Sequence, residues 1–134
     1  ARVVQHAELA VGAAEIDADV EAQTVEGDTP AGMIGLDIGT ETAEKYAEVI
    51  RDAELVTWNG PMGYFEIDTF AEGTYAVARA MAECNGMSIV GGGETSESVE
   101  TLGLQDQVSH VSTGGGACLD YLAGKELPGV AALE

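Results

Sequence analysis

Two runs of three glycines are the features of this sequence best suited to chemistry. Gly91-Gly92-Gly93 and Gly114-Gly115-Gly116 each follow a short apolar stretch and precede a helical pattern. Such a turn lets a ligand approach the backbone, and it leaves free N–H groups at a helix start, where the helix dipole favours negative charge. The pattern therefore predicts phosphate binding. The alternative, that the glycines only make tight turns and allow close packing of helix on strand, stays open.

Two residues directly after the first glycine run extend this chemistry. Glu94 would place a carboxylate where bound phosphates project their oxygens, and Mg²⁺ commonly joins one or two carboxylates to phosphate and water. Thr95 offers a hydroxyl to the same phosphates. Either residue is also an ordinary choice for the first turn of a helix, where a Glu suits the helix dipole. Neither glycine run matches a Walker A loop or the G-x-G-x-x-G motif of dinucleotide-binding folds.

Four further residues with reactive or polar groups have simpler explanations. His110, on an apolar stretch, is expected to be a hydrogen-bonded core histidine, and Trp58 a core ring or the border of the adjacent loop. Cys84 and Cys118 lie far apart without C-x-x-C spacing, which favours free buried thiols in a reducing cytosol.

The glycine runs belong to a repeated succession of strands, turns and helices. Residues Glu15 to Thr24 first alternate apolar and polar side chains, mostly acidic, as in a strand with one wet face. Four units follow, whose expected strands are Met33–Leu36, Leu55–Trp58, Met87–Val90 and Val108–Val111. Their expected helices run from a Thr40 cap through Ala43, Tyr46, Ala47 and Ile50, from Thr69 to Cys84, from Glu94 to Leu102, and up to Ala123.

This alternation predicts an α/β fold of Rossmann-like, three-layer type. The sheet should be mainly parallel, joined by right-handed crossovers and covered by helices on both faces. Its turns should gather at the carboxyl ends of the strands, where open α/β sheets bind ligands. The loop Asn59–Gly63 and both glycine runs are therefore expected to share one edge.

The charge balance excludes two classes of partner. Asp and Glu total 24 against five Lys and Arg, a net charge of −19. Such a chain repels phosphate backbones and anionic lipids, so neither nucleic acid nor membrane is expected as a partner. Self-repulsion favours a halophilic source in which salt screens the charge, with acidity merely for solubility as the alternative. No export signal opens the sequence, which favours a cytoplasmic protein.

Three segments together resemble the phosphoglycerate kinase family. They are Trp58–Glu66, Gly91–Thr95 and Val108–Ala117, in matching order and spacing. Gly124–Leu133 resembles that family's C-terminus, and Gly35–Gly39 resembles the turn ahead of its nucleotide loop. The similarity is strong from about Met33 onward. It implies that residues 1–134 are the C-terminal part of a nucleotide-binding domain, an incomplete lobe of a two-lobe kinase whose N-terminal substrate lobe is absent.

The resemblance also implies a reaction and a set of site residues. The family is a glycolytic phosphotransferase that moves a phosphoryl group reversibly between 1,3-bisphosphoglycerate and ADP, giving 3-phosphoglycerate and ATP, with Mg²⁺ on the nucleotide. Its pattern implies a ribose contact at Glu66, pocket-lining roles for Asn59 and Pro61, phosphate contacts at Gly91, Gly92, Gly93 and Thr95, a Mg²⁺ ligand at Glu94, and N–H groups near the transferred phosphoryl group at Gly114, Gly115 and Gly116. For Glu66 the alternative, an exposed acid among many, stays open.

Two departures from the family limit what this stretch is expected to do alone. Glu94 stands where many relatives carry Asp, so its carboxylate reaches one methylene farther. The family's basic 3-phosphoglycerate site and its phosphate-binding lysines lie outside the stretch that resembles this chain. The isolated chain is therefore expected to be at most a weak nucleotide binder, and Leu127–Leu133 to contact the missing lobe. A noncatalytic nucleotide-binding or interaction module stays the alternative.

Overall fold

The computed structural model describes residues 24–25, 28–31 and 33–133 of the chain. In order, its elements are α1 (Thr40–Asp52), β1 (Leu55–Asn59), the 3-10 turn η1 (Asp68–Phe70), α2 (Glu72–Ala82), β2 (Met87–Gly91), α3 (Gly93–Thr101), β3 (His110–Ser112), α4 (Gly116–Leu122) and α5 (Pro128–Ala131). The alternating strand expected from Glu15 lies outside the described residues except at Thr24, which is not in a strand.

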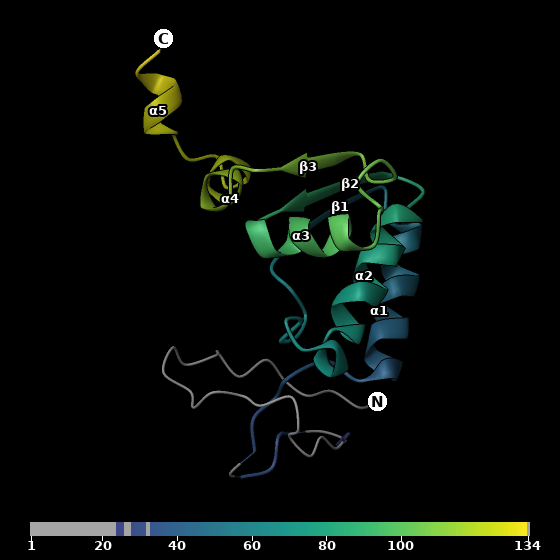
Figure 1. The fold of residues 1–134 in the computed structure, drawn as a ribbon. Coiled ribbons are helices and arrows are strands. Elements are labelled where there is room, and N and C mark those ends of the chain that lie inside the picture. The colour runs from purple at the N-terminus through teal and green to yellow at the C-terminus, as the bar shows by residue number, and fades with distance from the viewer. Residues whose placement is uncertain (1–23, 26–27, 32, 134) are drawn as a thin grey trace.

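The three strands form one parallel sheet in the order β1-β2-β3. Leu55 to Asn59 pair with Met87 to Gly91, and Ile89 to Gly91 pair with His110 to Ser112. Helix α2 connects the first two strands and α3 connects the second and third (Figure 1). Because parallel neighbours need such crossovers, the α/β prediction is confirmed.

One face of the sheet carries the core. Trp58 and Val90, paired across β1 and β2, point to this face and pack with Val77 and Met81 of α2 and with Val99 of α3. The helices lie on the same side of the sheet in Figure 1. The opposite face presents Leu55 and Met87, which are 62% and 54% exposed. Helices were expected on both faces, but α1, α2 and α3 all lie on the first face, and within the described residues the second face has no comparable cover (Figure 1).

The segment before α1 differs from expectation. Met33–Leu36 does not form the expected strand, because no described strand pairs with it and a strand needs a ladder of hydrogen bonds. Instead, the carbonyl of Leu36 accepts a hydrogen bond of 2.8 Å from the N–H of Tyr64. The N-cap of α1 is Gly39, with extended φ and ψ, and not Thr40, which is already helical.

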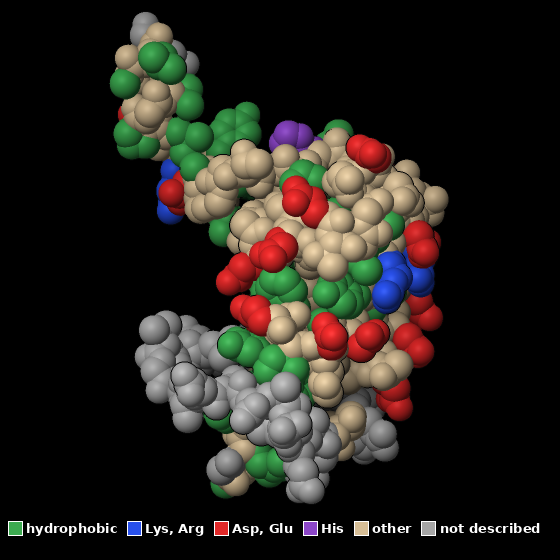
Figure 2. All heavy atoms as spheres, in the orientation of Figure 1, with side chains coloured by type: hydrophobic (Ala, Val, Ile, Leu, Met, Phe, Trp, Pro, Cys, Tyr) green, Lys and Arg blue, Asp and Glu red, His purple; other side chains and the backbone are tan. Residues whose placement is uncertain are grey.

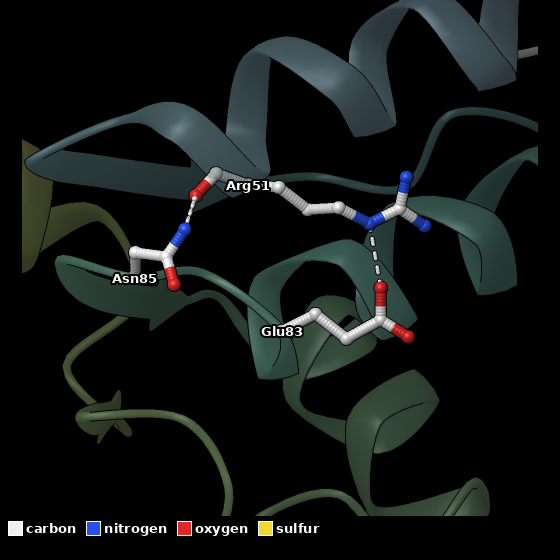
Figure 3. Close-up of polar contacts among 3 residues, drawn as sticks. All are labelled: Arg51, Glu83 and Asn85. Carbon is white, nitrogen blue, oxygen red and sulfur yellow. Dashed lines mark hydrogen bonds and ion pairs between the residues drawn. The ribbon is translucent and has the colours of Figure 1, made fainter.

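Helices α1 and α2 pack side by side. Ala43 and Ala47 are buried on α1, whereas Tyr46 is 46% exposed. At the end of α1, the Arg51 Nε lies 2.6 Å from Glu83 Oε2, and the Asn85 side chain donates to the Arg51 carbonyl at 3.0 Å (Figure 3). These contacts join α1 to the connection between α2 and β2. The Arg51–Glu83 ion pair is exposed, so it contributes at most about 1 kcal/mol to the free energy of unfolding.

Several surface features bear on the predictions. Asp and Glu side chains are spread over the face shown in Figure 2. His110 is exposed on β3, so the prediction of a core histidine is wrong. Cys84 and Cys118 are free, as expected, but only half-buried. Within the described parts of the chain, no helix has the length and apolar character needed to cross a membrane.

The two last helices have little contact with the core. Neither α4 nor α5 has a buried residue. Leu119 and Leu122 on α4 are 46% and 50% exposed, and Leu133 beyond α5 is 89% exposed. Figure 1 shows α5 projecting away from the sheet beyond α4. The polypeptide after β3 is therefore held mainly by its own local hydrogen bonds.

Candidate functional site

The carboxyl ends of the three strands lie next to one another. Asn59 at the end of β1 pairs with Gly91 at the end of β2, and Gly91 pairs with Ser112 at the end of β3. The loop after Asn59, the first glycine turn (Gly91–Gly93) and the second glycine turn (Gly114–Gly116) therefore start at one edge of the sheet. This juxtaposition confirms the shared edge that the sequence predicted.

The first glycine turn is in close contact with Asn59. A Cβ on Gly91 would lie 3.0 Å from the Asn59 Oδ1, and one on Gly92 would lie 3.2 Å from it. Gly92, the N-cap of α3, has φ 92° and ψ 145°, a conformation that side chains strongly disfavour. Glycine is thus required at this turn both by backbone conformation and by the approach of Asn59.

The two residues singled out after this turn have different surroundings. Glu94 is exposed in the first turn of α3, and its side chain makes no hydrogen bond or ion pair with the described residues. Thr95 is fully buried, and its Oγ1 accepts a hydrogen bond of 2.7 Å from the N–H of Gly60. Glu94 is therefore accessible to a ligand, whereas Thr95 joins the first glycine turn to the loop after β1.

The loop from Asn59 to Glu66, here the β1 loop, contains three of the predicted site residues. Asn59 and Glu66 are exposed, and Pro61 is half-buried. The N–H groups of Met62 and Gly63 donate to the Thr74 Oγ1 at 3.0 and 3.3 Å. The amides in the middle of the loop therefore point towards α2, and the predicted ligand-binding residues lie on either side of them.

Asp37 holds the start of α2 from a distant part of the chain. Its carboxylate accepts hydrogen bonds of 2.8 Å from the backbone N–H groups of Gly73 and Ile38. Burial raises the pKa of Asp37, and the nearby Glu72 adds to that rise, while the two backbone hydrogen bonds oppose it. The carboxylate replaces a local cap, since Ala71 at the N-cap position offers no side-chain acceptor.

Asp37 and Thr74 are the residues near the site whose roles the sequence did not reveal. Asp37 was visible only as part of a turn, and Thr74 only as one residue of an expected helix. Thr74 contacts the loop 11 and 12 positions away, and Asp37 reaches the start of α2 36 positions away. A hydroxyl in the first turn of a helix that follows a loop is the one local signal that would have drawn attention to Thr74.

The second glycine turn is more open. Gly115 is the N-cap of α4 with φ 51° and ψ −126°, and a Cβ on Gly115 or Gly116 would have no atom within 4 Å. The Gly114 N–H donates to the Ser112 Oγ at 3.3 Å. The Cys118 Sγ lies 3.6 Å from the Cβ position of Gly91, which places α4 beside the first turn. The two glycine turns are therefore neighbours.

The arrangement can bind an anion through backbone groups. The first-turn amides of α3 have no acceptor within their own helix, and the helix dipole adds partial positive charge there. No group of three or more His, Cys, Asp or Glu side chains in the described parts of the chain could hold a metal ion. A cation at Glu94 would therefore need oxygens from a phosphate ligand to complete its coordination.

Comparison with known proteins shows the family that the chain resembles. A family model described as phosphoglycerate kinase matches residues 3–125. The phosphoglycerate kinase of Roseiflexus sp. (strain RS-1) is 58% identical over 108 residues, covering 81% of this chain and 27% of the relative. That of Chlorobium limicola is 54% identical over 126 residues, covering 91% and 32%.

Solved structures agree with these relatives. The phosphoglycerate kinase of Coxiella burnetii matches with a TM-score of 0.74 and 42% identity, covering 83% of this chain and 29% of that one. The enzyme of Pyrococcus horikoshii OT3 matches with a TM-score of 0.67 and 46% identity, covering 73% and 24%. The chain thus spans about a third or less of the length of the relatives it matches.

Proposed function

Because the chain belongs to the phosphoglycerate kinase family, we propose that it supplies part of the Mg-nucleotide site of such an enzyme. The reaction would be the reversible transfer of a phosphoryl group between 1,3-bisphosphoglycerate and ADP, giving 3-phosphoglycerate and ATP. One observation carries the proposal: the pairing of Asn59 with Gly91, and of Gly91 with Ser112, brings the family's three motif segments to one edge of the sheet.

The proposed roles follow the order of the segments along this edge. In the β1 loop, Glu66 binds the nucleotide ribose while Asn59 and Pro61 line the pocket. The first glycine turn and the first turn of α3 hold the nucleotide phosphates. Glu94 binds Mg²⁺, which its exposure and lack of a described partner support. The second glycine turn directs N–H groups at the phosphoryl group in transfer, where developing charge needs stabilisation.

The burial of Thr95 limits its proposed role as a phosphate contact. The family pattern makes it a phosphate contact, but its side chain is fully buried beneath the first glycine turn. Its Oγ1 already accepts the Gly60 N–H, so only its hydroxyl proton remains to be donated. Contact with a phosphate would require the turn to open at this side chain. Without that opening, Thr95 supports the site by holding the β1 loop against α3.

Catalysis by the chain alone is not part of the proposal. Phosphoryl transfer depends on positioning and charge neutralisation from both substrates' sites. The 1,3-bisphosphoglycerate or 3-phosphoglycerate would bind through an N-terminal lobe, which Leu127–Leu133 would contact. We expect no turnover by the purified chain. Turnover is expected from a chimera in which the chain replaces the matching stretch of the Roseiflexus relative.

Titration of Mg·ADP into the purified chain tests the nucleotide site. We expect weak binding, with a Kd on the order of 1 mM, or about −4 kcal/mol. Glu94→Ala should weaken it about tenfold by removing the metal-binding carboxylate. Glu97→Ala is the matched control, because Glu97 is also exposed on α3. Binding that Glu94→Ala leaves unchanged, or that needs no Mg²⁺, would instead support a noncatalytic module.

The working environment is a separate part of the proposal. We place the protein in the cytoplasm of a halophile, because a net charge of −19 disfavours the compact state until salt screens it. Thermal stability should then rise with KCl. A midpoint of unfolding that stays constant between low salt and molar salt would support acidity for solubility alone.

A further inference from the structure

Thr74 lies fully buried beneath the β1 loop, in the first turn of α2. Its Oγ1 accepts the N–H groups of two consecutive loop residues, Met62 at 3.0 Å and Gly63 at 3.3 Å. A single hydroxyl oxygen thereby accepts hydrogen bonds from two backbone donors. Both bonds are partly buried, and a partly buried donor that loses its acceptor is unfavourable, so the loop is held to this side chain.

The loop is fixed on either side of this point as well. The Gly60 N–H donates to the Thr95 Oγ1 at 2.7 Å, and the Tyr64 N–H donates to the Leu36 carbonyl at 2.8 Å. Thr74 therefore holds the middle of the loop, between the segment that carries Pro61 and the segment that leads to Glu66. Without it, the backbone hydrogen bonds from residues 60–66 to other described segments would be those of Gly60 and Tyr64, beside the packing of Met62 against the core.

Thr74 is itself held in place. The preceding Gly73 N–H donates to the Asp37 carboxylate at 2.8 Å, which ties the first turn of α2 to the segment before α1. A Cβ on Gly63 would lie 2.5 Å from Asp37 Oδ1 and 2.6 Å from the Phe70 carbonyl, so the loop is closely packed at Gly63 against the segment before α1 and against η1. The hydroxyl is thus a rigid reference point for the loop.

We propose that Thr74 is a positioning residue, which sets nucleotide affinity through the β1 loop without contacting the nucleotide. The inference rests on the proposed function, because it takes the β1 loop to be part of the nucleotide pocket. Loss of the hydroxyl would let the middle of the loop shift and would misplace Pro61 and Glu66 together. Since these residues would contact the nucleotide before and during transfer, the effect falls mainly on binding.

The experiment uses the Roseiflexus chimera, assayed with ATP and 3-phosphoglycerate. Thr74→Val keeps the volume of the side chain but removes the acceptor. We expect KM for ATP to rise roughly tenfold, with kcat and KM for 3-phosphoglycerate within about twofold of the unaltered chimera. Thr74→Ser retains the hydroxyl and should restore KM for ATP. Thr101→Val makes the same change at an exposed residue of α3 and should have no effect.

The outcomes separate this inference from the proposed function. An unaltered chimera without turnover contradicts the proposed function. An active chimera in which Thr74→Val lowers the unfolding temperature but leaves KM for ATP unchanged overturns the positioning role and makes Thr74 merely structural. If Thr74→Val does not fold, Thr74→Cys takes its place, because a thiol is similar in size and only a weak acceptor. An unchanged KM for ATP in that variant also overturns the inference.

Discussion

The two glycine turns look alike in sequence and differ in their support. The first ends the central strand β2, is in contact with Asn59, and opens the nine-residue helix α3, whose Thr95, Ser98 and Val99 are buried. The second follows β3, a three-residue strand, and opens the seven-residue helix α4, which buries nothing. The first turn is therefore held in shape by the core, and the second only by local hydrogen bonds.

In the proposed enzyme, this difference would assign phosphate binding to the first turn and stabilisation of the transferred phosphoryl group to the second. A turn fixed by buried neighbours offers its amides to phosphates without having to be ordered first, which lowers the cost of binding. A turn on a lightly packed helix must be ordered by its ligand or by another part of the protein. In the proposed enzyme, the second turn would take its final position only when the substrate lobe closes, so that the phosphoryl group meets it late.

The largest effect should come from the helices behind the two turns. Val99→Ala removes a fully buried side chain of α3 and should lower the free energy of unfolding by about 2–3 kcal/mol. Leu119→Ala on α4 should change it by less than about 0.5 kcal/mol. Urea unfolding followed by fluorescence of Trp58, the single tryptophan, measures both. Equal losses would mean that α4 packs as firmly as α3.

An intermediate effect is expected within the turns themselves. Gly92→Ala must place a Cβ at a positive φ and against Asn59, which should cost about 1–2 kcal/mol. Gly116→Ala has an ordinary φ and open space, so its cost should stay within about 0.5 kcal/mol. The same unfolding measurement compares them. If Gly92→Ala were tolerated as well as Gly116→Ala, the first turn would not be rigid.

The smallest effect is the pH dependence of stability that comes from Asp37, which holds the start of α2. Burial raises the pKa of Asp37 in the folded protein, so the folded state binds protons more tightly there. Its contribution to the free energy of unfolding is therefore greatest at low pH and falls as pH rises from about 3.9 through the raised pKa. Partial exposure limits the change to a fraction of a kcal/mol.

Comparison with Asp37→Asn isolates this contribution. Asparagine has no carboxyl group to titrate, so the free energy of unfolding of the variant does not change with pH through this position. The stability of the unaltered chain relative to the variant should therefore decline from pH 4 to pH 7. A relative stability that increases over this range would show that the backbone hydrogen bonds to the carboxylate outweigh its burial.

Much of the fold was predictable from local pattern. The apolar runs around Trp58 and Val90 and the helical spacing of Val77 and Met81 indicated the strands and helix that the structure contains. Met33–Leu36 has the same apolar character, yet no described strand pairs with it. His110 lies on a strand with apolar neighbours but is exposed, because the described residues cover only one face of the sheet. The hydrophobic pattern along a strand does not show whether helices cover one face of the sheet or both.

The candidate site divides in the same way. Glu94 and the glycine turns could be proposed as site residues from residue type and spacing, because parallel strands bring their carboxyl ends together. Asn59 could be proposed only from the family resemblance. The acceptors of the loop amides, Thr74 and Thr95, came only from the tertiary structure. A threonine in a helix has the same local preferences whether or not a distant loop donates to it, so this part of the site depends on contacts between segments that sequence pattern does not encode.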